Sequence, residues 1–251
     1  MTALLNFFPP VIAHRGASAY APENTIVAFT KAAQLDIKWI EFDVMQAACG
    51  EAIVFHDETL DRTTNERGPV GDHPYAYLAA LDAGAWFDMR FAGEKIPTLK
   101  QALEFLVNTK MSANVEIKPL PGQEKSTAIR ALQAVSAYFP QPNPAILFSS
   151  FSIESLQALR DSSPNCLLGL LLHDWESRWQ TVCQSLQCIS VHVNEEIMTR
   201  DAAQEIKSMG KYLLCYTVNN PKRAMELYSW GVDAVFSDVP DKIVKALQLT
   251  K

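Results

Sequence analysis

Ionisable side chains stand at or beside the ends of several short apolar segments of the sequence. The set contains two histidines, three carboxylates and two cations: His14, His56, Glu41, Asp43, Glu116, Arg15 and Lys118. These residue types can transfer protons, hold a divalent cation and bind an anion. A histidine and an arginine at one strand end are also compatible with a core histidine and a surface ion pair. The chemistry therefore depends on whether the fold brings the set together.

The three carboxylates predict a metal site. Residues 38–44 alternate with a period of two, so Glu41 and Asp43 share one face of a strand, and Glu116 lies near the end of another strand-like segment. Three neighbouring carboxylates repel one another unless a cation lies between them. All-oxygen ligation favours one Mg²⁺ or Ca²⁺ ion over Zn²⁺. The alternative is a structural ion-pair network, which three acids and one lysine make less favourable.

The two histidines and two cations extend this prediction to a reaction. Imidazole changes its charge near neutral pH, so His14 and His56 beside a metal are expected to act as general acid and general base. Arg15 and Lys118 would add positive charge beside the same metal. Such a site suits phosphoryl transfer, in which negative charge builds on the non-bridging oxygens. Gly16, after Arg15, is interpreted as a turn that lets a substrate approach the backbone, or as a simple strand end.

The elements that must position these residues alternate between strand and helix. Eight segments are expected to form parallel strands: 11–13, 38–44, 113–118, 145–149, 167–171, 188–191, 212–217 and 234–237. Helical spacing follows several of them, as in 26–33, 99–106 and 124–139. Eight such units in 251 residues predict an α/β fold, the (β/α)8 TIM barrel, in which strand ends share one mouth. An open doubly wound sheet is the alternative, but no GxGxxG follows a strand.

One segment departs from the alternation. Only seven residues separate 52–57 from Val44, whereas a parallel crossover needs about a dozen or more, so this segment should return antiparallel and carry His56 back towards Glu41 and Asp43. Residues 58–96 are rich in turns and are interpreted as an insertion that shapes or covers the site. The chain lacks a linker-like tract, and we expect residues 1–251 to form a single domain.

Composition narrows the class of protein. A formal net charge of −6 disfavours nucleic-acid binding. Five cysteines without framework spacing indicate free thiols in a reducing compartment. The apolar residues 1–8 lack the basic start and cleavage site of a signal peptide, and the sequence contains no apolar run of the about 20 residues that a membrane span requires. A cytoplasmic protein without stable membrane insertion is expected.

A series of short motifs resembles the glycerophosphodiester phosphodiesterase family in order from near Ile12 to near Pro240. The motifs are His14-Arg15-Gly16, Glu23-Asn24-Thr25, Glu41-x-Asp43, His56-Asp57, Arg62-Thr63-Thr64, Ile96-Pro97-Thr98-Leu99, Glu116-Ile117-Lys118, Thr217-Val218-Asn219 and Gly231-Val232-Asp233. The resemblance implies a distorted barrel that hydrolyses small glycerophosphodiesters to sn-glycerol 3-phosphate and an alcohol. By position it implies metal ligation by Glu41, Asp43 and Glu116, acid/base roles for His14 and His56, and phosphate binding by Arg15 and Lys118.

Some positions depart from the family pattern or remain open. The family usually has Trp where this chain has Tyr216, and a Thr-Asp pair where it has Ser237-Asp238; the turn 65–68 is also altered. We interpret Tyr216 as a residue that stacks on the glycerol. Other side chains are given weaker interpretations. Trp175 is expected near the alcohol, Trp86-Phe87 either at the site wall or buried under the insertion, and His73, His173 and His192 in structural or surface positions.

Three other functions remain open from the sequence. A related phosphodiesterase that acts on lysophospholipids, of the lysophospholipase D type, would share the site but need a wider apolar rim. A metal-dependent sugar isomerase or aldolase barrel could also use carboxylates and histidines. A catalytically silent barrel that senses glycerophosphodiesters is disfavoured, because both histidines and all three acids are present.

Overall fold

Parallel strands close into a barrel in the computed structural model, which describes residues 7–249. The barrel strands are β1 (Val11–Ala13), β2 (Trp39–Gln46), β4 (Ser112–Ile117), β5 (Ile146–Ser150), β6 (Leu168–Leu172), β7 (Ser190–Asn194), β8 (Tyr212–Tyr216) and β9 (Ala234–Ser237). They pair in the order β2-β4-β5-β6-β7-β8-β9-β1, and a β1–β2 pairing closes the ring. The predicted (β/α)8 barrel is confirmed.

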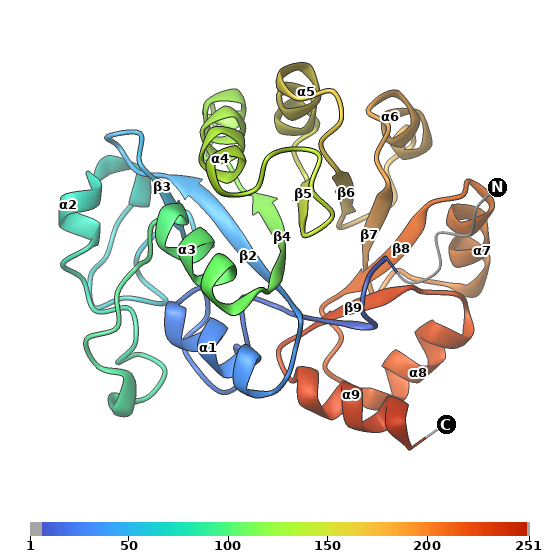
Figure 1. Ribbon diagram of the computed structural model, residues 1–251, viewed down its shortest axis with the longest axis horizontal. Coiled ribbons are helices and arrows are strands. Elements are labelled where there is room, and N and C mark those ends of the chain that lie inside the picture. Colours follow the sequence, from blue (N-terminus) through green and yellow to red (C-terminus); the bar gives the residue numbers. More distant parts are fainter. Residues whose placement is uncertain (1–6, 250–251) are drawn as a thin grey trace.

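Helices surround the strands (Figure 1). They are α1 (Ile26–Gln34), α3 (Leu99–Thr109), α4 (Glu124–Tyr138), α5 (Ile153–Ser162), α6 (Trp179–Ser185), α7 (Arg200–Ser208), α8 (Pro221–Ser229) and α9 (Pro240–Gln248). Side-chain caps fix several starting points: the Thr25 hydroxyl accepts from Ala28 N at the start of α1, and Thr98 and Gln101 form a reciprocal capping box at the start of α3. The principal apolar core lies between these helices and the outer faces of the strands.

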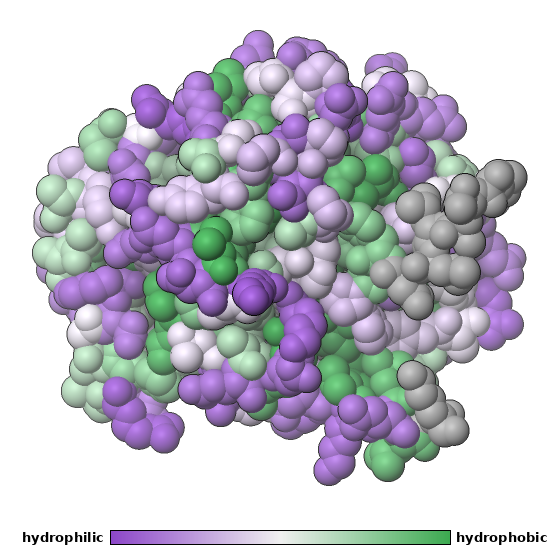
Figure 2. Space-filling view, viewed as in Figure 1, coloured by the Kyte–Doolittle hydropathy of each residue, from purple (hydrophilic) through white to green (hydrophobic). Residues whose placement is uncertain are grey.

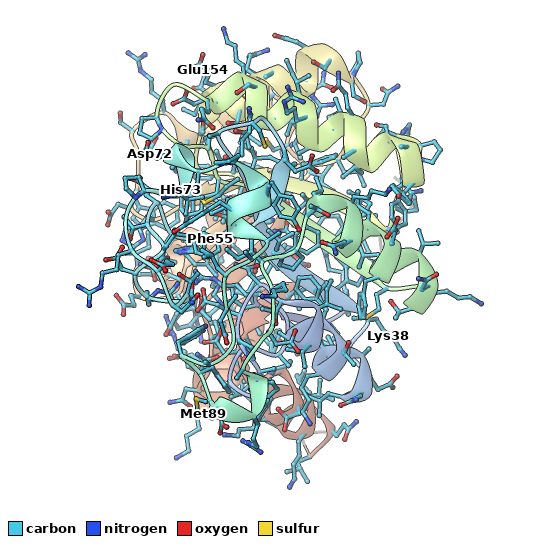
Figure 3. All side chains as sticks on the ribbon, turned by 90° about the vertical axis from the view of Figure 1, so that its left-hand side faces the viewer. Lys38, Phe55, Asp72, His73, Met89 and Glu154 are labelled. Carbon is cyan, nitrogen blue, oxygen red and sulfur yellow. The ribbon has the colours of Figure 1, made fainter. Side chains whose placement is uncertain are left out.

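The segment between β2 and α3 lies outside the regular alternation. Strand β3 (Ala52–Val54) pairs antiparallel with β2, as the short connection predicts. The insertion that follows contains η1 (Val70–Asp72), α2 (Tyr75–Leu78) and η2 (Met89–Phe91) and packs a second apolar cluster that includes Leu60 and Leu78. In Figure 3 this side of the molecule faces the viewer, with Met89 at its lower edge and Phe55 further in.

Side chains inside the barrel come from alternate strand positions. Asp43 on β2 is level with Glu116 on β4, so the two carboxylates face the same end of the interior. Apolar residues such as Ile12, Leu147 and Phe236 fill the middle. Aromatic rings close the opposite end, where Phe8 contacts Trp39 and Tyr212 with ring centroids 5.3 and 5.2 Å apart. Apolar and aromatic side chains therefore fill the barrel from the amino ends of the strands to its middle, and carboxylates lie at the carboxyl ends.

Strand β7 begins later than the sequence predicts. Strand character was expected over residues 188–191, but the structure has Ser190–Asn194. Cys188 N donates to Cys183 O, and Gln187 has a φ of 51°, so residues 186–188 complete the end of α6 instead. Ile189 already bonds to the neighbouring strands through Leu168 O and Tyr212 N. This shift places His192 in the middle of a strand. Its side chain is fully buried, as the structural interpretation of this histidine requires.

The outer surface has a mixed character. Hydrophilic and weakly polar residues cover most of the face in Figure 2, and hydrophobic residues show between them in separate places. Among residues 7–249, no helix combines the length and the apolar character that crossing a membrane requires. The five cysteines are free thiols, of which Cys49 is exposed and the others buried, as their spacing predicts.

Candidate active site

A cavity of about 280 Å³ opens at the carboxyl ends of the barrel strands. Each sequence-predicted site residue lines it: His14, Arg15, Glu41, Asp43, His56, Glu116, Lys118 and Tyr216. The residues come from β1, β2, β4 and β8 and from the segment after β3. The barrel brings them together because successive parallel strands end at the same rim.

The three carboxylates form a tight, buried cluster. Oxygen atoms of Glu41, Asp43 and Glu116 all lie within 4.8 Å of one another. Burial, and then repulsion from Asp43, raises the pKa of Glu116 to about 8. Burial and repulsion from both neighbours also raise the pKa of Glu41, whose Oε1 atom is buried without a hydrogen-bond partner. The atoms of this cluster are all carboxylate oxygens, their negative charges repel one another, and Glu41 Oε1 lacks a hydrogen-bond partner. Such a cluster fits a hard divalent cation.

Arg15 lies beside this cluster and neutralises part of its negative charge. Its backbone N–H donates to Glu41 Oε2 at 2.9 Å, and its Nε lies 3.4 Å from Asp43 Oδ2. Its Nη1 donates to Glu23 Oε1 at 2.6 Å. Although burial alone would raise the pKa of Asp43, the charge of Arg15 and the cations near it hold that pKa below its ordinary value. Asp43 is thus a carboxylate, while its neighbours are poised to gain a cation or a proton.

Gly16 lies in a turn, as one of the two interpretations of the sequence has it, and close packing of α1 adds a second reason for glycine at this position. Its φ is +82°, and a Cβ atom there would lie 2.7 Å from the backbone carbon of Ala28 in α1. The residue therefore allows the chain to turn sharply while α1 packs against it.

Each proposed catalytic histidine has a carboxylate on its Nδ1 atom. His14 Nδ1 lies 2.7 Å from Asp238 Oδ1, and His56 Nδ1 lies 2.5 Å from Asp57 Oδ1. His56 Nε2 is 2.6 Å from the Nζ of Lys118, which can donate to it. Burial is the largest influence that lowers the pKa of His56, and the cations Arg15 and Lys118 add to it. With Nδ1 engaged, Nε2 is the atom of each imidazole that can exchange a proton with a substrate, and in His56 this exchange requires Lys118 to turn from Nε2 towards a bound anion.

One wall of the cavity is apolar. It is formed by Phe151, Leu171, Tyr216 and Phe236. The Tyr216 hydroxyl donates to Leu172 O at 2.8 Å, and its ring meets Phe151 edge to face at 5.9 Å between centroids. A bound molecule therefore meets charged groups on one side and carbon surfaces on the other.

Sequence reasoning missed several residues of the site. Asn114, a fully interior residue, lies two positions before Glu116 on the same face of β4, and its Nδ2 donates to Ser149 Oγ at 2.9 Å. Its Oδ1 atom is buried without a partner, so it can accept from, or ligate, a molecule in the cavity. The period of two that selected Glu116 could have found it. His173, one residue beyond β6, also lines the cavity, and the strand-end rule could have found it.

Other residues lie elsewhere. Trp175 was expected near the alcohol but lines a separate depression between α6 and α7, with its ring 5.9 Å from that of Trp179. Trp86 belongs to the insertion, where its Nε1 donates to Ala83 O, and its neighbour Phe87 packs on Phe91. Among the described residues, neither Trp86 nor Phe87 lines the cavity.

The two remaining histidines have structural partners. His73 stacks on Tyr77 with ring centroids 4.3 Å apart. His192 Nε2 is 2.9 Å from Ser190 Oγ, in the barrel interior. Burial lowers the pKa of His192 to about 3, so this imidazole is neutral at physiological pH. The structural interpretation of both residues agrees with these contacts.

Comparison with known proteins shows one consistent relationship. Residues 14–242 match the model of the glycerophosphoryl diester phosphodiesterase family. A glycerophosphodiester phosphodiesterase of Caldanaerobacter subterraneus subsp. tengcongensis is 32% identical over 247 residues, which cover 95% of this chain and 97% of that protein. A Bacillus subtilis glycerophosphodiester phosphodiesterase is 33% identical over 250 residues, covering 92% and 83% of the two chains.

A solved structure gives the same result. The Oleispira antarctica phosphodiesterase, solved in complex with the product sn-glycerol-3-phosphate, superposes with a TM-score of 0.93 at 38% identity, covering 96% of this chain and 98% of that one. A glycerophosphodiester phosphodiesterase of Agrobacterium tumefaciens superposes with a TM-score of 0.76 at 31% identity, covering 95% and 100%. The relationship extends over almost the whole chain.

Proposed function

Because this chain belongs to the glycerophosphoryl diester phosphodiesterase family, we propose that it is a metal-dependent enzyme that hydrolyses small glycerophosphodiesters to sn-glycerol 3-phosphate and an alcohol. The observation that carries the proposal is the cavity in which three buried carboxylates, two carboxylate-bound histidines and two cations face one apolar wall. The product complex of the Oleispira antarctica relative supports this substrate class.

The acidic cluster would hold the cation. Glu41, Asp43 and Glu116 offer oxygens within 4.8 Å of one another, and the unpartnered Oε1 of Glu41 and Oδ1 of Asn114 offer further acceptors in the same wall. When bound, one Mg²⁺ or Ca²⁺ ion would polarise a phosphate oxygen and offset the charge that develops in the transition state. Arg15 and Lys118 would bind the other phosphate oxygens.

The histidines would move the protons. Since Asp238 and Asp57 hold the two Nδ1 atoms, one Nε2 can take the proton of the nucleophile while the other gives a proton to the departing alcohol. The P–O bond to the alcohol breaks as a new P–O bond forms. The nucleophile is either the neighbouring glycerol hydroxyl, followed by opening of a cyclic phosphate by water, or water directly. The apolar wall at Tyr216 would face the carbon side of the glycerol.

Turnover assays with purified protein test the proposal. A panel of glycerophosphocholine, glycerophosphoethanolamine and glycerophosphoglycerol is incubated with Mg²⁺, with Ca²⁺ or with chelator, and glycerol 3-phosphate is measured. We expect product only with a cation. Equal activity in chelator would contradict the metal model, and lack of product with every substrate and ion would contradict the reaction.

Two further substrates refine the test. A phosphodiester that lacks the neighbouring hydroxyl distinguishes the nucleophiles, because cleavage at the full rate would exclude the internal route. Lysophosphatidylcholine in liposomes tests the lysophospholipid alternative. We expect much slower release from liposomes, since the site offers a compact cavity of about 280 Å³.

A further inference from the structure

Arg62, near the start of the insertion, joins two carboxylates from different parts of the chain. Its Nη1 and Nη2 donate to Glu23 Oε2 and Oε1 at 2.6 and 2.8 Å. Its Nε and Nη2 donate to Asp57 Oδ2 and Oδ1 at 2.7 and 2.9 Å. The planar guanidinium thus binds both carboxylates through paired hydrogen bonds, a geometry that fixes their orientation as well as their charge.

Each of these carboxylates also contacts a residue that we place in the active site. Glu23 Oε1 accepts from Arg15 Nη1 at 2.6 Å, and Asp57 Oδ1 lies 2.5 Å from His56 Nδ1. Arg62 is therefore the central member of a chain of contacts from the phosphate-binding arginine to an acid/base histidine. In the described part of the chain Arg62 does not itself line the cavity, and its side chain is 44% exposed.

Opposite charges alternate along this series of contacts, which favours a fixed arrangement of Glu23, Arg62 and Asp57. Burial alone would raise the pKa of Glu23 and of Asp57, but hydrogen bonds from Arg62 are the next influence on each and help to hold both pKa values below their ordinary range. Both groups are therefore carboxylates throughout the neutral range. A carboxylate that Arg62 shares can offset only part of the charge of Arg15, which leaves Arg15 positive toward a phosphate.

The backbone that carries Arg62 is well anchored. Leu60 is fully buried in the second apolar cluster, and the Thr64 hydroxyl donates to Leu60 O at 2.8 Å. Gly68 N donates to Asp61 Oδ2 at 3.0 Å, which closes the turn on its other side. The guanidinium is thus presented from a rigid turn, as a group that positions others requires.

We propose that Arg62 is a positioning residue for the reaction, through which the insertion holds His56 and Arg15 in working geometry. The proposal rests on the proposed function. Without the guanidinium, Asp57 loses two of the bonds that hold it against His56, and Glu23 is free to neutralise Arg15. The first change acts on proton transfer by His56, and the second acts on phosphate binding by Arg15. Arg62 itself does not touch the substrate.

The test measures kcat and KM for glycerophosphocholine at saturating cation in Arg62→Ala, in Arg62→Lys and in the matched control Arg67→Ala, an exposed arginine of the same turn. We expect kcat of Arg62→Ala to fall about 10–100-fold, the range typical of groups that orient catalytic or metal-binding residues. Millimolar guanidinium or methylguanidinium should restore part of the loss. Arg62→Lys keeps the charge but not the paired hydrogen bonds and should remain impaired. Arg67→Ala should match the wild type.

Thermal unfolding and product binding separate positioning from plain stabilisation. A lower Tm with normal kcat in the folded protein would overturn the proposal, as would a kcat loss that guanidinium leaves unchanged in both Arg62 variants. Calorimetry should show weaker glycerol 3-phosphate binding in Arg62→Ala than in Arg67→Ala, and equal binding would also overturn it. If the wild type releases no glycerol 3-phosphate, the proposed function fails instead, and that result is read from the wild type alone.

Discussion

Replacing Glu116 by Gln should make the protein more stable without cation and less responsive to cation. The side chain is buried in the acidic cluster, where its pKa is about 8 against an ordinary 4.5. Between these two pH values the folded, cation-free chain keeps a proton that the unfolded chain has lost. The contribution of Glu116 to stability in chelator therefore falls as the pH rises through this window and is lowest above about pH 8.

The magnitude follows from the shift. At 1.36 kcal/mol for each pH unit, a difference of about 3.5 units corresponds to at most about 5 kcal/mol of destabilisation above pH 8. Gln has nearly the same shape and carries no charge, so Glu116→Gln should recover a large part of this amount. With cation present the order reverses, because the wild type gains binding energy from a third carboxylate and the variant does not.

Chemical denaturation at pH 6 and pH 9, each with chelator and with saturating Ca²⁺, checks both halves of this expectation. Glu66→Gln serves as the control, since that carboxylate is exposed on the insertion. A Glu116→Gln variant that is less stable than the wild type in chelator at pH 9 would refute the reasoning. An equal stabilisation of both proteins by Ca²⁺ would remove Glu116 from the cation site.

Three other outcomes are expected. Replacing His14 or His56 by Ala should lower kcat about 10²–10⁴-fold while calorimetric Ca²⁺ binding stays close to that of the wild type; near-normal turnover in both variants would contradict the acid/base roles. Gly16→Ala should lower the free energy of unfolding by about 2 kcal/mol or more, measured by urea denaturation, because the new Cβ meets α1 at 2.7 Å and the φ is +82°. His192 has a pKa of about 3 when folded and 6.5 when free, so its contribution to stability should fall by up to about 1.4 kcal/mol per pH unit as the pH drops below 6.5. His192→Gln should lack this contribution, so the difference in stability between the variant and the wild type should change with that slope in acid titrations followed by circular dichroism.

Local sequence patterns carried much of the information about the barrel and its mouth. The period of two over residues 38–44 placed Glu41 and Asp43 on one face, and in the structure Asp43 is level with Glu116 on the neighbouring strand. The short connection after Val44 required an antiparallel return, which β3 makes. These features depend on spacing along the chain, and spacing is visible in a sequence.

Features that depend on contacts between distant residues were not accessible in the same way. The approach of Asp238 to His14 joins positions 224 residues apart, and the motif that contains Asp238 gave no sign of its partner. The paired contacts of Arg62 require the three-dimensional path of the insertion. The sequence could indicate a turn at Gly16 but not the packing of α1 against it, because that contact appears only in the folded chain.

The ring of aromatic side chains at the lower end of the barrel has a kinetic consequence. Phe8, Trp39 and Tyr212 pack edge to face there, so among residues 7–249 these rings fill the end of the barrel opposite to the active-site cavity. Substrate and products are therefore expected to use the cavity at the carboxyl ends of the strands. Glycerol 3-phosphate would then occupy the same cations as the phosphate of the substrate, so we expect it to inhibit turnover competitively.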